Sequence, residues 1–171
     1  MPGFEVTRVV DAEIDRVFEI FTDLEGSLTR CKGIIGIELE TTGPVGKGTI
    51  FKETRQVFSR ESTETLEFTE FQPPSHWVIS GVSCGAQFTS RFDLQPEGGG
   101  TRVIVTIHVK PLNPFAWLMS LLAPLLNGTM KRAINEDMDT LSSIADGTWT
   151  EPEPEPEPEQ EVEAEDAPSS D

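Results

Sequence analysis

Apolar and polar residues alternate in six runs between Gly33 and Lys110, and short stretches rich in Gly, Pro and Ser separate these runs. Alternation with period two predicts β-strands that bury one face, and hairpin-length connections favour antiparallel pairing. A seventh run, "FEVTRVV", lies near the N-terminus. The predicted strands cover residues 4–10, 36–40, 49–58, 63–71, 76–82, 86–94 and 101–109.

A helical period follows the first strand. Ile14, Val17, Phe18 and Phe21 recur at the i, i+3, i+4 and i+7 positions of one helix face, and we expect Asp11 to cap this helix. Gly26 should interrupt it before a second short helical turn at residues 28–31.

Residues 127–146 also have the period of an amphipathic helix, and Gly147 provides a stop. Its apolar face consists of Met130, Ile134, Met138, Leu141 and either Ile144 or Ala145. The predicted order is therefore one strand, two helical segments, six strands and a long helix. An antiparallel sheet with segregated helices belongs to the α+β class.

The segment "PFAWLMSLLAPLLNG", residues 114–128, is strongly apolar. Its uninterrupted part, 114–126, is shorter than the roughly 20 residues that span a bilayer, and Pro124 would kink or restart a helix there. It therefore does not span a membrane. Peripheral membrane contact through 114–126 and a dimer interface remain open for it, so the protein is either a monomer or a homodimer.

Five segments in this order resemble the START-like (SRPBCC) superfamily, which includes birch-pollen-type allergens, and in particular its polyketide cyclase/dehydrase and lipid-transport branch. They are "VVDAEIDRVFEIFTD", "GIIGIELETTGPVGKGTIF", "LEFTEFQPPSHWVISG", "FDLQPEGGGTRVIVTI" and "LLAPLLNGTMKRAINEDMDTL". The resemblance implies a helix-grip fold, in which a curved seven-stranded antiparallel sheet wraps a long C-terminal helix around an internal cavity. Its expected occupant is a small hydrophobic molecule, such as a lipid, a quinone or a polyketide-like compound. Given such a cavity, we expect residues 114–128 to form a lid over one of its mouths, in preference to the membrane contact or dimer interface named above.

Aromatic residues on the strands and adaptable methionines on the long helix could line such a cavity. A fully packed α+β core would show the same pattern, so the sequence leaves both interpretations open. The expected ligand-binding residues are Phe51, Phe68, Trp77, Phe88, Phe92, Trp117, Leu121, Met130, Ile134 and Met138.

Candidate catalytic groups are few. The chain has no Tyr, and neither His76 nor His108 belongs to a nucleophile motif. Glu53 and Arg55 share a strand face with Phe51, so they are either paired inside the protein or solvated outside it. We expect Arg91 to face water. A non-catalytic carrier is therefore the favoured hypothesis, and a cyclase or dehydrase that uses Glu53 and Arg55 is the alternative.

Charge and composition restrict the partners. The net charge is −17, but the ten acidic residues from Glu151 onward leave −7 on residues 1–150. This balance argues against a nucleic-acid partner. We divide the chain into a folded domain, 1–147, and an acidic Glu-Pro tail, 148–171, expected to be disordered; this tail could serve as a spacer or dock a basic partner. Cys31 and Cys84 suggest free thiols in a cytoplasmic protein, and no metal site or cofactor is expected.

Overall fold

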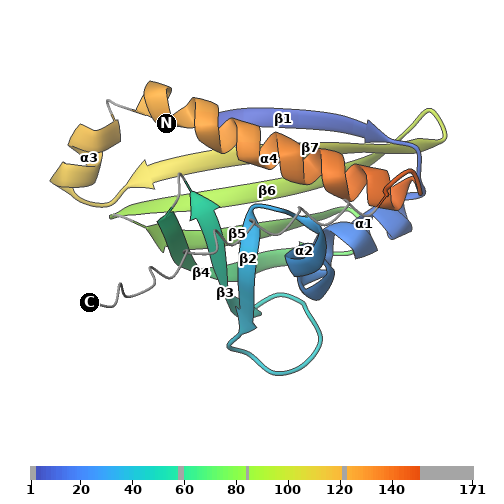
Figure 1. Ribbon diagram of the computed structural model, residues 1–171, viewed down its shortest axis with the longest axis horizontal. Coiled ribbons are helices and arrows are strands. Elements are labelled where there is room, and N and C mark those ends of the chain that lie inside the picture. The colour runs from blue at the N-terminus through green and yellow to red at the C-terminus, as the bar shows by residue number, and fades with distance from the viewer. Residues whose placement is uncertain (1–2, 58–59, 84, 121–122, 151–171) are drawn as a thin grey trace, which may run out of the picture.

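The structure, a computed structural model, describes residues 3–57, 60–83, 85–120 and 123–150. Seven strands form one antiparallel sheet in the order β1-β7-β6-β5-β4-β3-β2, which confirms the predicted seven-stranded sheet (Figure 1). The strands are β1 (Gly3–Val10), β2 (Ile34–Leu39), β3 (Ile50–Val57), β4 (Arg60–Gln72), β5 (His76–Ser83), β6 (Ala86–Glu97) and β7 (Gly100–Pro111).

Four helices complete the described part of the domain. Helices α1 (Ile14–Thr22) and α2 (Leu24–Arg30) connect β1 to β2 at one end of the sheet. The long helix α4 (Ala123–Ala145) runs across one face of the sheet and packs against β1, and α3 (Pro114–Ser120) lies at the opposite end from α1 (Figure 1). This arrangement confirms the helix-grip α+β fold.

We call the sheet face that looks toward α4 the inner face. The strand register aligns Phe51, Leu66, Gly81, Phe88 and Val109 in one row across five neighbouring strands of this face. The buried core lies between the inner face, α1 and the C-terminal half of α4. Burial of these apolar side chains is the main favourable contribution to the folding free energy of such a domain.

The start of α1 differs from the prediction. The helix begins at Ile14 with Glu13 at the N-cap, so Asp11 is not its cap. The Thr101 hydroxyl donates a hydrogen bond of 2.8 Å to the Ala12 carbonyl, which ties residue 12 to the start of β7 and delays the helix. Asp11 and Ala12 therefore form the bend that follows β1.

Two other helix predictions need correction. Gly26 lies inside α2 and does not interrupt a helix before it, because the Asp23 carboxylate accepts the Gly26 amide proton and caps α2. The apolar segment also forms a helix of its own, α3, so two helices follow β7 where the predicted order had one. Gly147, at φ 79°, follows the end of α4 as expected, and the predicted tail from Glu151 onward lies outside the described residues.

Candidate functional site

The inner face carries all five aromatic residues that the sequence analysis placed in a cavity. Phe51, Phe68 and Trp77 are buried at 1%, 0% and 1% exposure. Their rings contact one another or other core rings, since the centroids of Phe51 and Phe68 are 5.6 Å apart and Trp77 stacks on Phe92 at 4.7 Å. At these three positions the protein's own side chains fill the interior.

The middle of the inner face is less covered. Ile79, Phe88, Ser90 and Phe92 are only half-buried, although β5 and β6 lie at the centre of the sheet. Three of them have buried hydrophobic neighbours in the same row, because Phe68 pairs with Ile79, Ile107 with Ser90 and Trp77 with Phe92. We call the four residues Ile79, Phe88, Ser90 and Phe92 the central floor.

Gly81 determines how the Phe88 ring lies at this floor. A Cβ atom at Gly81 would stand 2.6 Å from Phe88 Cζ and 2.8 Å from Leu66 Cδ2. Such contacts are too short to exist, so only the missing side chain lets the Phe88 ring lean across the neighbouring strand. The central floor therefore presents an aromatic surface to the space beneath α4.

The apolar side chains of α4 become more exposed toward the N-terminal end of the helix. Met138 is buried in the core at 2% exposure, Ile134 packs partly buried against it, and Met130 is 49% exposed. Trp117 on α3 is 61% exposed, so the structure places it at the surface. Leu121 lies outside the described residues.

Glu53 and Arg55 point to the inner side of β3, as Phe51 does. Arg55 Nε lies 2.5 Å from Glu53 Oε1, and Arg55 Nη1 lies 2.7 Å from Asp137 Oδ2 on α4. The guanidinium therefore bridges the sheet and the helix with two charge-assisted hydrogen bonds. The sequence analysis did not identify Asp137, which lies beside the apolar face of α4 and has no motif of its own.

Electrostatics hold this cluster in its charged form. Burial opposes the charge on Arg55, but Glu53 and Asp137 outweigh it and raise the pKa of the guanidinium above its ordinary value. The neighbouring Cys31 thiol is 2% exposed. Burial and then the negative charge of Asp137 raise its pKa from 9.0 to about 12, so this thiol stays neutral.

Glu64 is a second carboxylate that sequence reasoning missed. It pairs with Glu53 in the register of β3 and β4, and its Oε1 accepts hydrogen bonds from the hydroxyls of Ser62 at 3.0 Å and Ser83 at 2.7 Å. Like charges in directly opposed strand positions are unfavourable. The alternation of Glu64 with Leu66 and Phe68, both buried, was the available signal that it faces inward.

Two hollows accompany these groups. The first, of about 320 Å³, lies beside α4 and is lined by Lys32, Gly33, Arg55, Ala133, Glu136, Asp137, Asp139 and Thr140. The second, of about 340 Å³, is shallower and lies mainly over outward-facing residues of β3 to β6. Of the residues expected from the sequence to bind a ligand or catalyse, only Arg55 lines either hollow, so the cavity over the central floor stays a prediction.

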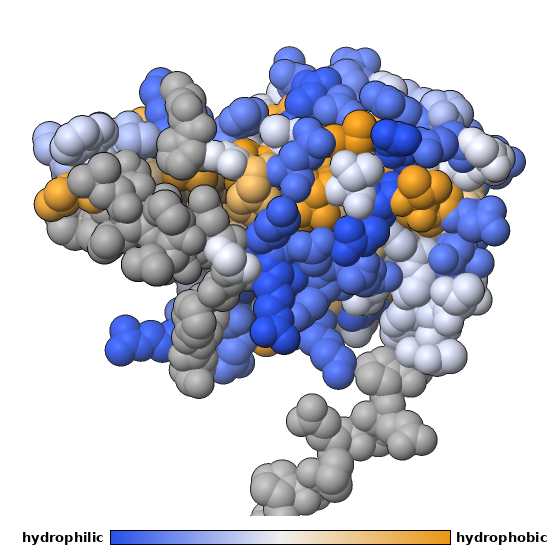
Figure 2. Space-filling model, turned by 90° about the horizontal axis from the view of Figure 1, so that it is seen from above, coloured by the Kyte–Doolittle hydropathy of each residue, from blue (hydrophilic) through white to orange (hydrophobic). Residues whose placement is uncertain are grey.

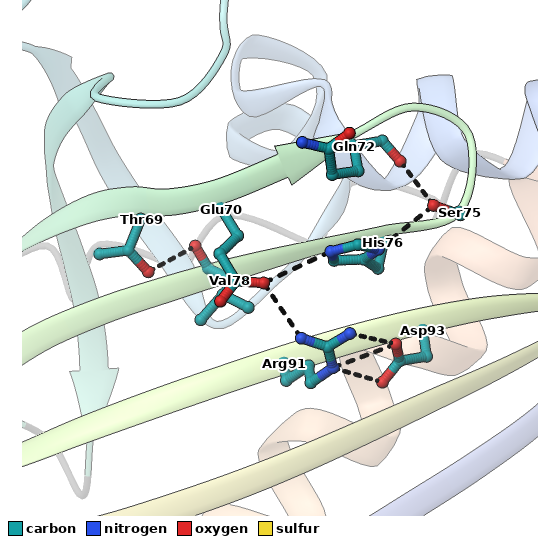
Figure 3. A network of polar contacts seen from close by, with 8 residues as sticks. All are labelled: Thr69, Glu70, Gln72, Ser75, His76, Val78, Arg91 and Asp93. Atoms are coloured by element: carbon teal, nitrogen blue, oxygen red, sulfur yellow. Dashed lines mark hydrogen bonds and ion pairs between the residues drawn. The ribbon is translucent and has the colours of Figure 1, made fainter.

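The outer face of the sheet carries a separate polar network (Figure 3). Glu70 Oε2 lies 3.1 Å from Arg91 Nη1 and 3.4 Å from His76 Nε2, and Arg91 also pairs with Asp93 at 2.9 Å. Arg91 thus lies on the side away from α4, as predicted. The network links β4, β5 and β6 on the opposite side of the sheet from the central floor.

The arrangement is suited to holding an amphipathic guest. Aromatic side chains of the central floor can bury an apolar body, and the carboxylates and guanidinium beside it can meet polar atoms. Among the described residues, no group of three His, Cys, Asp or Glu side chains is placed to hold a metal ion. No described helix is long and apolar enough to cross a bilayer.

Comparisons with known proteins point to one family. The family model described as polyketide cyclase/dehydrase and lipid transport matches residues 1–145. The protein TTHA0849 from Thermus thermophilus has a TM-score of 0.68 at 19% identity, with 87% of this chain and 100% of that chain covered. No curated protein matches the sequence significantly.

Two further solved structures are aromatase/cyclases. The di-domain ARO/CYC StfQ from the steffimycin biosynthetic pathway has a TM-score of 0.73 at 13% identity, covering 85% of this chain and 51% of its own. The Zhui aromatase/cyclase from Streptomyces sp. R1128 has a TM-score of 0.67 at 15% identity, covering 84% and 93%. At these identities the likeness shows the fold alone.

Proposed function

Because this chain belongs to the polyketide cyclase/dehydrase and lipid-transport family, we propose that it binds a small hydrophobic molecule between the central floor and α4. The observation that carries the proposal is the incomplete burial of Ile79, Phe88, Ser90 and Phe92 at the centre of a sheet covered by helices. Side chains in that position are normally buried in a domain of this size.

Affinity would come from removing this apolar surface from water. Each Å² of apolar area buried is worth roughly 25 cal/mol, so both the guest's own apolar surface and the exposed part of the central floor contribute to affinity. Met130 on α4 can adapt to guests of different shape, since the flexible methionine side chain fills irregular gaps, and Ile134 adds a fixed apolar surface beside it. The apolar surfaces select for size more than for chemical identity.

The test fills the proposed space. A Ser90→Trp variant places an indole on the central floor, and the matched control Gln87→Trp places the same group on the outer face of the same strand. Binding of a lipophilic fluorescent probe should weaken at least about tenfold in Ser90→Trp and stay unchanged in Gln87→Trp. Equal affinity in all three folded proteins would refute binding at the central floor.

A second candidate function is catalysis of the cyclase or dehydrase type at the same place. The observation in its favour is that Glu53 and Arg55 lie on the inner side of β3 and carry Glu64 and Asp137 as charged neighbours. Such groups could exchange protons with a bound polyketide-like substrate.

Replacing Glu53 and Arg55 by Gln separates the two functions. A carrier keeps its affinity for the lipophilic probe in the double variant. An enzyme keeps the affinity but loses the cyclisation of a linear poly-β-ketone, which mass spectrometry of the product would detect. If the wild type leaves that substrate unchanged, the catalytic candidate fails and the carrier remains.

A further inference from the structure

The end of the molecule that carries α3 exposes several large apolar side chains. Leu112, Trp117, Leu118 and Met130 are 52%, 61%, 56% and 49% exposed, and we call these four residues the α3 patch. In Figure 2 hydrophobic residues reach the surface at the end that carries α3, as well as along the middle of the molecule. Exposed apolar groups gathered at one end of a domain commonly mark a contact surface.

Local hydrogen bonds hold α3 with its apolar residues turned outward. The Asn113 side chain accepts the Ala116 amide proton at 2.7 Å and caps the helix, and the Leu112 amide donates to the Gly85 carbonyl at 2.9 Å. Among the α3 residues whose side chains are described, Ala116 faces the protein, at 6% exposure. A small residue on the inner side leaves Trp117 and Leu118 on the other side of the helix.

The charges around the α3 patch differ from those of the rest of the chain. Between Gly98 and Asn135 there is no Asp or Glu, although the protein as a whole has a net charge of −17. Three exposed basic residues, Lys110, Lys131 and Arg132, bracket the apolar segment. Arg132 pairs with Glu136 at 3.0 Å, but its side chain is 82% exposed and can reach a further anion.

We propose that the α3 patch docks on the surface of a phospholipid bilayer, with Trp117 and Leu118 in the interfacial region and Lys110, Lys131 and Arg132 at the lipid phosphates. Tryptophan and leucine beside flanking cations are the composition of such interfacial contacts. A second copy of the chain is the weaker candidate occupant, because a symmetric contact through this patch would bring the same basic residues together. α3, with seven residues, is too short to span.

This contact goes beyond binding of a guest and does not depend on it. It would place the turn between β5 and β6, to which α3 is tied through Gly85, at the lipid surface. Phe88 of the central floor lies near the start of β6, only a few residues after that turn. A hydrophobic guest would then exchange with the bilayer over a short path.

The experiment measures co-sedimentation of the full chain with vesicles of phosphatidylcholine alone and of phosphatidylcholine mixed with phosphatidylglycerol. We expect binding to both, and stronger binding to the anionic mixture. Trp117→Ser/Leu118→Ser should reduce the partition coefficient at least about tenfold on both vesicles. Val9→Ser/Leu39→Ser, which removes two side chains of similar exposure elsewhere, should leave it unchanged. Lys131→Glu/Arg132→Glu should abolish only the preference for the anionic vesicles.

A second measurement leaves the α3 patch unchanged and follows the fluorescence of Trp117. In a Trp149→Phe background the remaining tryptophans are buried Trp77 and exposed Trp117, so brominated phosphatidylcholine should quench the fluorescence of Trp117. Absence of vesicle binding by the full chain, or equal loss in the control variant, would overturn the proposal. So would a change from dimer to monomer in Trp117→Ser/Leu118→Ser without loss of vesicle binding, because the α3 patch would then be a contact between copies.

Discussion

Cys31 shows how one buried group connects the charged cluster to stability. Its folded-state pKa of about 12 lies above the ordinary 9.0 because of burial and Asp137. The raised pKa favours the neutral thiol, so this contribution to stability is complete below pH 9 and is lost as the pH rises toward 12. From pH 8 to pH 10, the stability advantage of the wild type over Cys31→Ala should shrink by about 1.4 kcal/mol. Chemical denaturation at the two pH values measures it.

The absence of tyrosine makes this measurement clean, because no phenol titrates in the same range. A difference that stays constant between pH 8 and pH 10 would contradict the raised pKa of the buried thiol. Labelling provides an independent check, since Cys31 in a Cys84→Ser background should react with iodoacetamide at pH 8 only after unfolding.

Arg55 should be the most sensitive charged residue on the inner face. In Arg55→Met the carboxylates of Glu53 and Asp137 lose their shared partner while they remain largely covered, at 16% and 17% exposure. The variant should lose about 2–3 kcal/mol of unfolding free energy. Lys52→Met, on the outer side of the same strand, breaks the exposed pair with Glu40 and should cost far less. Equal losses of unfolding free energy in Arg55→Met and Lys52→Met, measured by urea denaturation, would contradict a larger contribution of the Arg55 ion pairs.

A residue's place in the site was hardest to predict where it depends on a contact between two secondary-structure elements. The alternation around Phe51 placed Glu53 and Arg55 on one strand face, but only the packing against α4 shows that this face is the inner one. Asp137 and Glu64 became visible as parts of the site only through the contact between β3 and α4 and the register of β3 with β4. Strand register is not encoded in the period-two pattern alone.

At the scale of the elements, β5 and β6 owe their close packing to Gly81. In Gly81→Ala the new methyl would meet Phe88, Leu66 and the Thr65 carbonyl oxygen at 2.6, 2.8 and 2.9 Å, and the backbone oxygen cannot move aside easily. We expect a loss of about 1–3 kcal/mol in thermal or chemical unfolding, together with a displaced Phe88 ring. The control Gly36→Ala adds the same methyl where the nearest atom is 3.4 Å away. A Gly81→Ala variant as stable as Gly36→Ala would contradict this packing.

The elements themselves were well predicted where one period extends over many residues. All seven strands follow their predicted alternation and α4 its predicted helical period, and the structure moves their ends by up to four residues, outward at most ends and inward at both ends of β3. The connections were predicted less well, since the bend at Asp11 and Ala12 depends on Thr101, which is far away in sequence. Likewise, α2 includes Gly26 because the Asp23 side chain caps the helix at the Gly26 amide. This local hydrogen bond outweighs the helix-breaking tendency of glycine.

For the whole molecule, the sequence could not decide between a packed and a hollow interior. Phe51, Phe68 and Trp77 fill one part of it with ring contacts, and the half-buried central floor lies in the same rows of the same face. Both parts have the same alternating pattern in the sequence. What distinguishes them is the path of α4, which among the strands packs mainly against the edge strand β1 and leaves β5 and β6 less covered.

The uneven charge of the whole chain bears on docking at the bilayer. The tail from Glu151 carries ten acidic residues and no basic one, so a chain that ends at Thr150 has a net charge of −7 where the full chain has −17. The acidic tail and an anionic vesicle repel each other because both are negatively charged. Salt weakens this repulsion, with a screening length of about 10 Å at moderate ionic strength. Deletion of residues 151–171 should therefore strengthen binding to phosphatidylglycerol-containing vesicles at low salt, leave binding to phosphatidylcholine vesicles unchanged, and show no difference at high salt.

The thermal midpoint should stay the same, because the described domain ends before the tail. If deletion weakens binding to the anionic vesicles, the tail itself takes part in the contact, and the α3 patch with its three basic residues is not sufficient for docking.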